Sequence, residues 1–398
     1  MAAAGGISPL QVFVKAAGAG NAPSHRDREA VRPFRGPPSG SAQRARPMFR
    51  HSLSGAGLNL HVAHGFETPA LDELQKRFSV NWPCIAAAKA SADAVCRDLM
   101  GSVLNEVALP PDCSLVMFGS LARGEWTDGS DLDWVLLVDG QVSGAHYNAM
   151  LGLRAIFENR SPGSTGTFAG LAISHDLIHL IGGQDDTNRN LTLRMSLLLE
   201  SVPMSDDAAY DRVVRALLDR YLIEPSSFSE KVTPRFLLND LVRYWRTIGV
   251  DYADKFHDEA GRKAVIRNVK LRFSRKLIYA AGLNACLTWY RTRADARATI
   301  ALFRHMVDTS PLELIAEACR LNNAPGPLVE GLFGSYDGFL CALGNQEQRG
   351  DLGKLQPAAA MSDQLFLSLR ESGRAFQKSL AELFSLVGAA ELLNYAIF

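Results

Sequence analysis

The sequence has no long apolar run and no recognisable export signal. No segment approaches the roughly 20 consecutive apolar residues that span a bilayer. The N-terminus lacks a charged start followed by a sustained apolar stretch, which excludes a secretory signal of the usual kind. We therefore expect a soluble, cytoplasmic protein that does not enter a membrane.

The sequence also has no excess of either charge. Lys+Arg and Asp+Glu number 42 each among the 398 residues, so the formal net charge is zero. A chain without a global positive field does not attract a long nucleic-acid duplex, although a local basic patch can still bind phosphates. A long duplex is therefore not an expected partner.

Closely spaced cysteine pairs are absent as well. Zinc sites and redox motifs need such pairs because their ligands must converge on one point. The six cysteines are scattered along the chain: Cys84, Cys96, Cys113, Cys286, Cys319 and Cys341. We expect reduced, mostly buried thiols, as in cytoplasmic proteins.

Composition indicates a globular protein preceded by a polar tail. Hydrophobic residues make up 47% of the chain and charged residues 21%, as in ordinary soluble domains. The length allows about two domains. Residues 1–65 are rich in Ala, Gly, Pro, Ser and Arg, so they cannot bury enough apolar surface to offset the entropy of ordering. We predict that residues 1–65 are a disordered tail.

The hydrophobic pattern predicts an α+β fold. Short apolar runs predict buried strands over 114–118, 132–138 and 168–174. Apolar spacing of three or four residues predicts helices over 84–107 and 145–158. Beyond residue 190 the helical spacing is nearly continuous, over 191–201, 208–222, 236–248, 262–281, 296–306, 312–321, 326–343 and 362–394. We therefore predict a small α/β core over 66–201 and a larger all-helical domain over 202–398.

One run between the first two predicted strands combines a Gly-Ser pair with two aspartates. Gly119-Ser120 closes the first strand, ten residues follow, and Asp131-Leu132-Asp133 opens the second. Glycine lets the backbone approach a phosphate closely, and Ser120 adds a hydroxyl donor. Two positions apart on a strand, Asp131 and Asp133 point to the same face. Adjacent carboxylates repel each other unless divalent cations lie between them, and Mg²⁺ prefers such oxygen ligands.

This run resembles the signature of the polymerase-beta-like nucleotidyltransferase superfamily, in which Gly-Ser precedes a strand-borne Asp-x-Asp. The resemblance implies a core of that fold and transfer of a nucleoside monophosphate from an NTP, with ATP as the expected NTP, and release of pyrophosphate. It implies Mg²⁺ or Mn²⁺ at Asp131 and Asp133 and nucleotide phosphates at Gly119 and Ser120. The acceptor stays open among a protein, a tRNA and a small molecule.

Superfamily members usually carry a third acid on a neighbouring strand. Asp176 follows the third predicted strand, so it is the first candidate for a third metal ligand and for the group that takes the acceptor's proton. Asp185 and Asp186, in the next loop, are the alternatives. Each of these aspartates also has a structural explanation, because aspartate commonly caps helix N-termini.

His175-Asp176 also suggests a metal-dependent phosphohydrolase of the His-Asp class, since His179 lies one helical turn beyond His175. That class needs further His and Asp ligands elsewhere. The remaining histidines, such as His146 and His257, have no matching context. A packed or capping histidine is the favoured interpretation.

A basic segment in the helical half provides candidates for the triphosphate. From residue 262 to 276 there are seven basic residues and no acidic one. On a helical projection, the buried stripe is Ile266, Val269, Phe273 and Leu277, and the stripe beside it is Lys263, Arg267, Lys270 and Ser274. Superfamily members bind the triphosphate through a Lys and a Ser on a helix of the second domain, so the resemblance implies Lys270 and Ser274. A solvated basic helix and a site for RNA phosphates are the alternatives.

The expected function is thus a metal-dependent nucleotidyltransferase acting on an unidentified acceptor. Two other functions stay open beside it. One is a non-catalytic nucleotide- or RNA-binding module of the same fold, which the uncertain third acid allows. The other is a cyclic-dinucleotide synthase, which the same superfamily includes.

Overall fold

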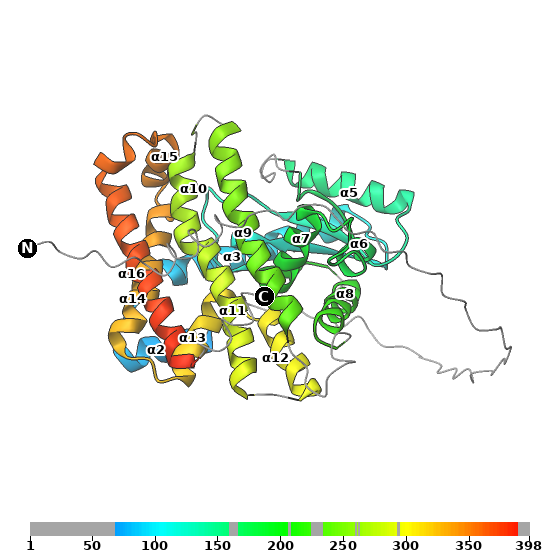
Figure 1. Cartoon of the computed structure of the whole chain (residues 1–398). Helices are drawn as coiled ribbons and strands as arrows, with labels where there is room; N and C mark the ends of the chain where they lie inside the picture. The colour runs from blue at the N-terminus through cyan, green and yellow to red at the C-terminus, as the bar shows by residue number, and fades with distance from the viewer. Residues whose placement is uncertain are drawn as a thin grey trace, which may run out of the picture. The chain divides into compact units, whose positions relative to one another are not determined.

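The computed structural model describes residues 68–158, 166–205, 208–223, 234–258, 261, 263–292 and 295–388 (Figure 1). The tail predicted over residues 1–65 lies outside the described residues. The last residues of the helix predicted over 362–394 lie outside them too, as does Arg262 of the basic segment.

The centre of the α/β part is a mixed four-stranded sheet in the order β3-β2-β1-β4. Its strands are β1 (Cys113–Phe118), β2 (Trp134–Val138), β3 (Gly170–Ile173) and β4 (Ser201–Pro203). Strand β1 pairs antiparallel with both β2 and β4, whereas β2 and β3 are parallel. The first three strands were predicted. The short β4 was not, because it has only three residues and the first, Ser201, falls within the helix predicted over 191–201.

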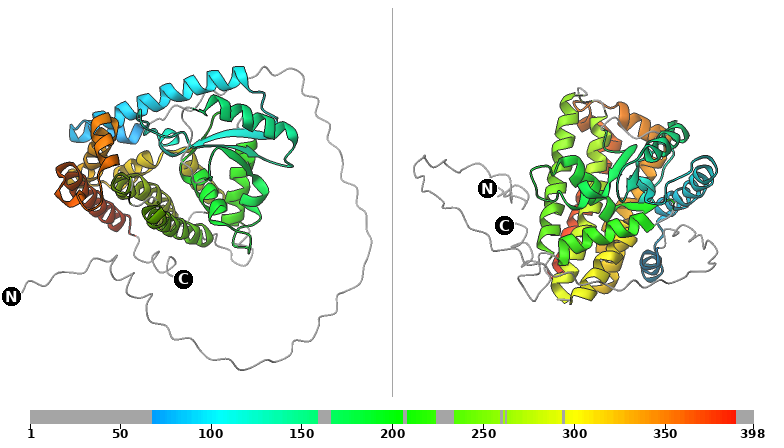
Figure 2. Two further views of the ribbon diagram at one scale, coloured as in Figure 1. Left: turned by 90° about the horizontal axis from the view of Figure 1, so that it is seen from above. Right: turned by 90° about the vertical axis from the view of Figure 1, so that its right-hand side faces the viewer.

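Helices cover both faces of this sheet, as the turned views show (Figure 2). Helices α3 (Pro83–Glu106) and α5 (Gly144–Ile156) pack on the face formed by Leu115, Met117 and Leu136. Helices α7 (Asn188–Leu199) and α8 (Ala208–Leu218) pack on the opposite face. Burial on both faces explains why β1 and β2 are continuous apolar runs rather than alternating ones.

The rest of the described chain is helical. It contains η3 (Asp219–Ile223), α9 (Arg235–Asp258), α10 (Ala264–Lys270), η5 (Leu271–Arg275), α11 (Lys276–Thr292), α12 (Ala296–Asp308), α13 (Pro311–Leu321), α14 (Gly326–Gly344), α15 (Gln346–Lys354), η6 (Ala360–Ser362) and α16 (Gln364–Val387). The predicted stripe of Ile266, Val269, Phe273 and Leu277 is buried in the core of this part. The α+β fold class is confirmed.

The N-terminal helices pack against the C-terminal ones. In α2 (Pro69–Phe78), the amides of Ala70 and Leu71 donate to the Glu313 carboxylate of α13 at 2.5 and 3.1 Å. In α3, the Ile85 amide donates to Asp337 of α14 at 2.8 Å. These acids satisfy amides that a helix start leaves without partners. The boundary between two domains at residue 201 stays a prediction.

A disulfide joins Cys84 of α3 to Cys341 of α14, with a Cα–Cα distance of 5.3 Å. The expectation of six reduced thiols is therefore wrong for these two. They are 257 residues apart in sequence, and only the packing of α14 on α3 brings them together, so cysteine spacing could not reveal the pair. The other four cysteines are free and buried, and burial raises the pKa of each to about 12. The cytoplasmic location stays a prediction.

Among the described helices, none has both the length and the apolar character needed to cross a membrane.

Candidate active site

Gly119 follows β1 directly and lies against the second aspartate of the motif. The Phe118 amide donates to the Asp133 carbonyl at 2.9 Å. The pairing between β1 and β2 therefore extends to Asp133, one residue before β2 begins. Gly119 has a φ of +68°, a left-handed conformation that favours glycine. A Cβ at this position would lie 2.8 Å from Asp133 Oδ2. Backbone conformation and space thus both require glycine, and they bring the Gly-Ser turn next to the Asp133 carboxylate.

The sequence predicted Asp131 and Asp133 on the second strand, but β2 begins only at Trp134. Both aspartates lie in the segment that leads into it. Asp131 is exposed and Asp133 is half-buried. Burial raises the pKa of Asp133 to about 6; Arg275 opposes this shift, whereas Glu200 and Asp131 add to it. A nearby cation would stabilise the ionised form of a carboxylate in this setting. Two acidic oxygen donors whose charges disfavour each other therefore fit a hard divalent ion such as Mg²⁺.

The turn before Asp131 is tied to the helical part. Its backbone closes through the Ser130 amide and the Thr127 carbonyl at 2.8 Å. Arg349 of α15 donates from Nη1 to Thr127 Oγ1 at 3.0 Å and from Nη2 to the Gly129 carbonyl. A Cβ on Gly129 would lie 2.7 Å from Arg349 Cζ, so a larger residue there would displace this flexible side chain. Burial lowers the pKa of Arg349, and the Asp131 carboxylate opposes that shift.

Lys270, at the end of α10, belongs to the same site. Its ammonium interacts electrostatically with Asp131. The Lys270 pKa is lowered to about 8, mainly by burial and also by the charges of Arg349 and Arg275, while Asp131 opposes the shift. Several cations therefore gather opposite the two aspartates. A polyanion such as a triphosphate would relieve their mutual repulsion.

A π-helical turn brings a further cation to this side. Elements α10, η5 and α11 follow one another without a gap, and η5 has the wider π-helical winding. Arg275, five residues after Lys270, interacts with Asp133 and lies 3.5 Å from Glu200 Oε1. π-Turns inside α-helices often mark functional sites. A uniform 100° projection could not place Arg275 here.

Buried charges connect the motif to the helices behind it. Arg123, just after the Gly-Ser turn, donates to Glu125 at 2.8 Å and forms an ion pair with Glu200. The Tyr336 hydroxyl of α14 donates to Glu125 Oε1 at 2.7 Å, and Ser274 hydrogen-bonds to Tyr336. Ser274 thus has a protein partner, and its predicted contact with the triphosphate stays a prediction. No sequence pattern indicated this network, because charged residues in a loop are usually exposed.

Glu200 is the acid that tertiary structure adds next to Asp133. It precedes β4, and β4 pairs with β1 so that Ser201 lies opposite Phe118. This register places Glu200 beside Gly119, where its charge raises the Asp133 pKa. Glu200 is buried and is held by Arg123 and Arg275. The carboxylates of Asp131, Asp133 and Glu200 do not all converge within 4.8 Å of one another.

The placement expected for Asp176 is wrong. Strands β2 and β3 are parallel, and Ile173 pairs with Val138 at the far end of β2. Asp176 follows Ile173, whereas Asp133 precedes the near end of β2, so a full strand separates them. Five residues at about 3.3 Å each make this some 17 Å. Asp176 is half-buried and pairs with its neighbour His175 at 3.5 Å.

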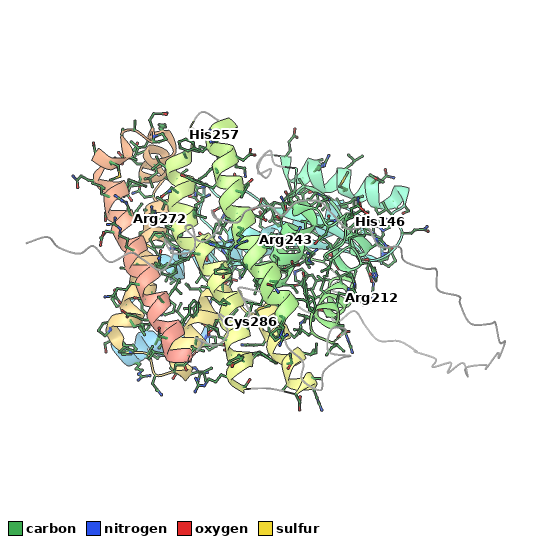
Figure 3. The ribbon with its side chains drawn as sticks, in the orientation of Figure 1. His146, Arg212, Arg243, His257, Arg272 and Cys286 are labelled. Carbon is green, nitrogen blue, oxygen red and sulfur yellow. A yellow bond between two sulfur atoms is a disulfide. The ribbon has the colours of Figure 1, made fainter. Side chains whose placement is uncertain are left out.

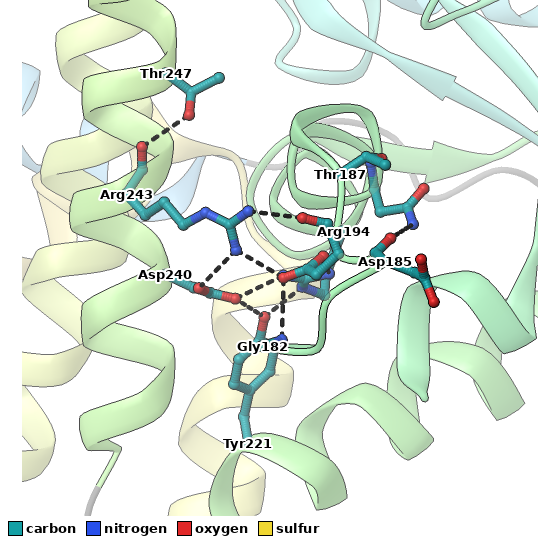
Figure 4. Close-up of polar contacts among 10 residues, drawn as sticks. Gly182, Asp185, Thr187, Arg194, Tyr221, Asp240, Arg243 and Thr247 are labelled. Carbon is teal, nitrogen blue, oxygen red and sulfur yellow. Dashed lines mark hydrogen bonds and ion pairs between the residues drawn. The ribbon is translucent and has the colours of Figure 1, made fainter. Parts of the chain in front are cut away.

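Asp185 and Asp186 do not reach the site either, because they lie at the start of α7 and Glu200 follows its end. Asp186 accepts hydrogen bonds from Arg194 at 3.0 and 3.1 Å and from Arg243 at 2.6 Å (Figure 4). Asp240 of α9 also accepts from Arg194, at 2.7 Å. Two acids and two arginines form a compact cluster that joins α7 to α9.

The phosphohydrolase interpretation gains no support from the described residues. His175 and His179 are exposed, with ring centroids 5.3 Å apart, and no third ligand joins them there in metal-binding geometry. His146 is a packed histidine whose Nε2 lies 2.9 Å from Asp112 Oδ1 (Figure 3).

A cavity of about 300 Å³ borders Glu200 from the side of β4. The segment from His305 to Pro311 forms its opposite wall. Gly119, Asp131 and Asp133 do not line it, so it is separate from the aspartate pair.

Comparison with known families agrees with this geometry. Residues 102–165 match the family model described as a nucleotidyltransferase domain, a range that contains the Gly-Ser turn and both aspartates. No curated protein matches the chain significantly. The chain therefore carries a nucleotidyltransferase domain, consistent with the polymerase-beta-like superfamily that its motif resembles.

Proposed function

We propose that this protein is a metal-dependent enzyme that transfers a nucleoside monophosphate from an NTP, with ATP as the first substrate to test, and releases pyrophosphate. One observation carries the proposal. Asp131 and Asp133 lie beside a glycine turn that a Cβ would block, and cations from the helical part face them.

In this proposal Asp131 and Asp133 hold Mg²⁺ or Mn²⁺. The bound metal supplies Lewis-acid activation of the attacking oxygen and charge stabilisation of the leaving pyrophosphate. Gly119 and Ser120 bind phosphate oxygens, because the turn lets the chain approach them closely. Lys270 contacts the terminal phosphates with a charge-assisted bond. Ser274 supports the site by holding Tyr336.

Glu200 replaces Asp176 as the third acid of the proposal. Its position beside Asp133 supports a role in completing the acidic site or in taking the acceptor's proton. Arg349 positions Asp131 by fixing the preceding turn.

The acceptor is a protein, a tRNA or a small molecule. The direct test incubates pure protein with each labelled NTP and Mg²⁺, with and without cell extract. Labelled protein, labelled RNA or a soluble labelled product identifies the acceptor class, and a cyclic dinucleotide would appear without extract. If no NTP gives pyrophosphate under any condition, the catalytic proposal is wrong.

A non-catalytic nucleotide-binding module is the second candidate. The ion pairs that Glu200 forms with Arg123 and Arg275 favour it, because an acid held by two arginines is less available to a metal. A module of this kind binds NTP in calorimetry without turnover.

Single substitutions distinguish between the candidates for the third acid. Glu200→Gln should lower turnover per folded molecule by at least about 10²-fold if Glu200 acts on metal or proton. Asp176→Asn, at the other end of the sheet, should leave turnover within about twofold. Both are assayed well below the melting temperature, since Glu200→Gln leaves Arg123 with less compensation. If Asp176→Asn shows the large loss and Glu200→Gln does not, the assignment must be reversed.

Lys270→Ala should weaken NTP binding by about 1.5–3 kcal/mol, the contribution of a hydrogen bond to a charged group. Binding of the nucleoside monophosphate, which lacks the terminal phosphates, should hardly change. Because the Lys270 pKa is about 8 in the free protein, NTP affinity should also fall as pH rises through that value. Calorimetry at one fixed salt concentration measures both ligands.

Arg272 provides the matched control for Lys270. It lies two residues on, where its Nε donates to Asn268 at 2.7 Å and its side chain packs against Gly373 of α16 (Figure 3). Arg272→Ala should change neither affinity by more than about 0.5 kcal/mol. Equal losses of NTP and monophosphate in Lys270→Ala would indicate a general defect of the site and remove the triphosphate assignment.

A further inference from the structure

Three potential metal ligands converge where α3 begins beside α14. Cys84 is the second residue of α3, and Asp337 and Cys341 lie one turn apart on α14. The two sulfur atoms and one carboxylate oxygen all lie within 4.8 Å of one another. Asp337 uses Oδ1 to accept from the Ile85 amide at 2.8 Å, while its Oδ2 lies 3.9 Å from Cys341 Sγ. One carboxylate oxygen therefore faces the sulfur pair.

This pair differs from the other cysteines. Cys84 is half-buried and Cys341 is exposed, whereas the four free cysteines are buried. The N-terminus of a 24-residue helix carries partial positive charge, which favours a thiolate at Cys84 once the disulfide is opened. In a reducing compartment a disulfide with one exposed cysteine is open to attack by a small thiol.

We propose that, in the reduced protein, Cys84, Cys341 and Asp337 form a site for a thiophilic divalent cation such as Zn²⁺. Two molecules of a low-molecular-weight thiol open the disulfide, leaving two protein thiols and one oxidised thiol dimer. Binding of the cation then displaces two protons from sulfur. Two thiolates and one carboxylate give three protein ligands, and water completes a tetrahedral shell.

The site is separate from the aspartate pair and does not depend on nucleotide transfer. Its soft sulfur ligands select Zn²⁺ over Mg²⁺, which prefers oxygen. Its three charges total −3 against the +2 of the ion, and the helix N-terminus favours this net negative charge. Either the disulfide or the cation therefore fastens α3 to α14. The same stretch of α14 carries Tyr336, which bonds to Glu125 behind the active site.

Cobalt(II) tests the proposal because thiolate ligation gives it an intense near-ultraviolet charge-transfer band that oxygen ligands do not give. We expect reduced, full-length protein to bind one Co²⁺ with this band and to release about two protons per ion. Zn²⁺ should abolish the band by competition. The oxidised protein should not show it. This comparison needs no variant, so a folding defect cannot obscure it.

Variants then assign the ligands. Cys84→Ser and Cys341→Ser should each remove most of the band, and Asp337→Asn should weaken Co²⁺ affinity by at least about tenfold. Cys113→Ser is the matched control, because its side chain donates to the Pro110 carbonyl at 3.1 Å and serine can keep that bond. Absence of the band in the reduced wild type, or its persistence in Cys84→Ser, would overturn the proposal.

Discussion

Replacing Asp131 and Asp133 together with asparagine is expected to lower pyrophosphate release by about 10³-fold or more. Asparagine keeps the shape of each side chain but removes the charge that holds a divalent ion. Loss of one preorganised electrostatic contact to a transition state already costs about 10²–10³-fold. A coupled pyrophosphate assay with saturating Mg²⁺ measures the effect, and EDTA should reduce the wild type to a similar level.

The same double variant should be as stable as the wild type or more so. The folded pKa of Asp133 is raised to about 6 from 3.8. Ionising this group is therefore costlier in the folded chain, and the wild type loses stability as pH rises from about 4 through 6. At neutral pH without metal, the variant should gain up to about 2–3 kcal/mol. Thermal unfolding in EDTA at pH 4 and pH 7.5 measures this difference.

Asp128→Asn is the control, because Asp128 is an exposed aspartate in the same loop. It should change turnover less than about twofold and stability by less than about 0.5 kcal/mol. Wild-type turnover in the double variant would remove these aspartates from the catalytic assignment. A large fall in melting temperature would instead show that they support the fold.

Asp186→Asn is expected to produce the largest loss of stability, about 3–5 kcal/mol. The change removes a buried charge from between Arg194 and Arg243, and the Arg194 side chain is completely buried (0% exposed). Arg194 keeps its ion pair with Asp240 but loses the one with Asp186. Chemical denaturation at pH 7 measures the loss. Turnover of the molecules that remain folded should change little, because this cluster does not reach Asp133.

The pH dependence provides an independent check. Burial alone raises the Asp186 pKa, but hydrogen bonds from Arg194, the Gly182 amide and Arg243 outweigh it and hold that pKa below its usual value. Asp186 therefore stabilises the fold above pH 4, and its contribution falls as the pH drops further. The difference in unfolding free energy between the wild type and Asp186→Asn should therefore shrink below pH 4. Asp185→Asn, an exposed neighbour, should change stability by less than about 0.5 kcal/mol.

The sequence by itself determined the features that depend on local spacing. Gly119-Ser120 and Asp131-x-Asp133 were found because a predicted strand lies on either side of them. Two strands joined by a short loop hold the two ends of that loop close together. The stripe of Ile266, Val269 and Phe273 was found because helical periodicity reports burial directly. Lys270, beside this stripe, interacts electrostatically with Asp131, because the side of a helix next to its buried face borders a neighbouring element. Its contact with a triphosphate stays a prediction.

Only the tertiary structure decided which distant residues meet. The register of β4 on β1 brings Glu200 to Asp133, and the parallel pairing of β2 with β3 sends Asp176 to the opposite end of the sheet. Packing of α14 on α3 joins Cys84 to Cys341 across 257 residues, and α15 brings Arg349 to the turn before Asp131. Strand order, strand direction and helix packing arise from contacts between separate segments. The residue pattern of a segment shows which of its faces is buried. It does not show which other segment covers that face.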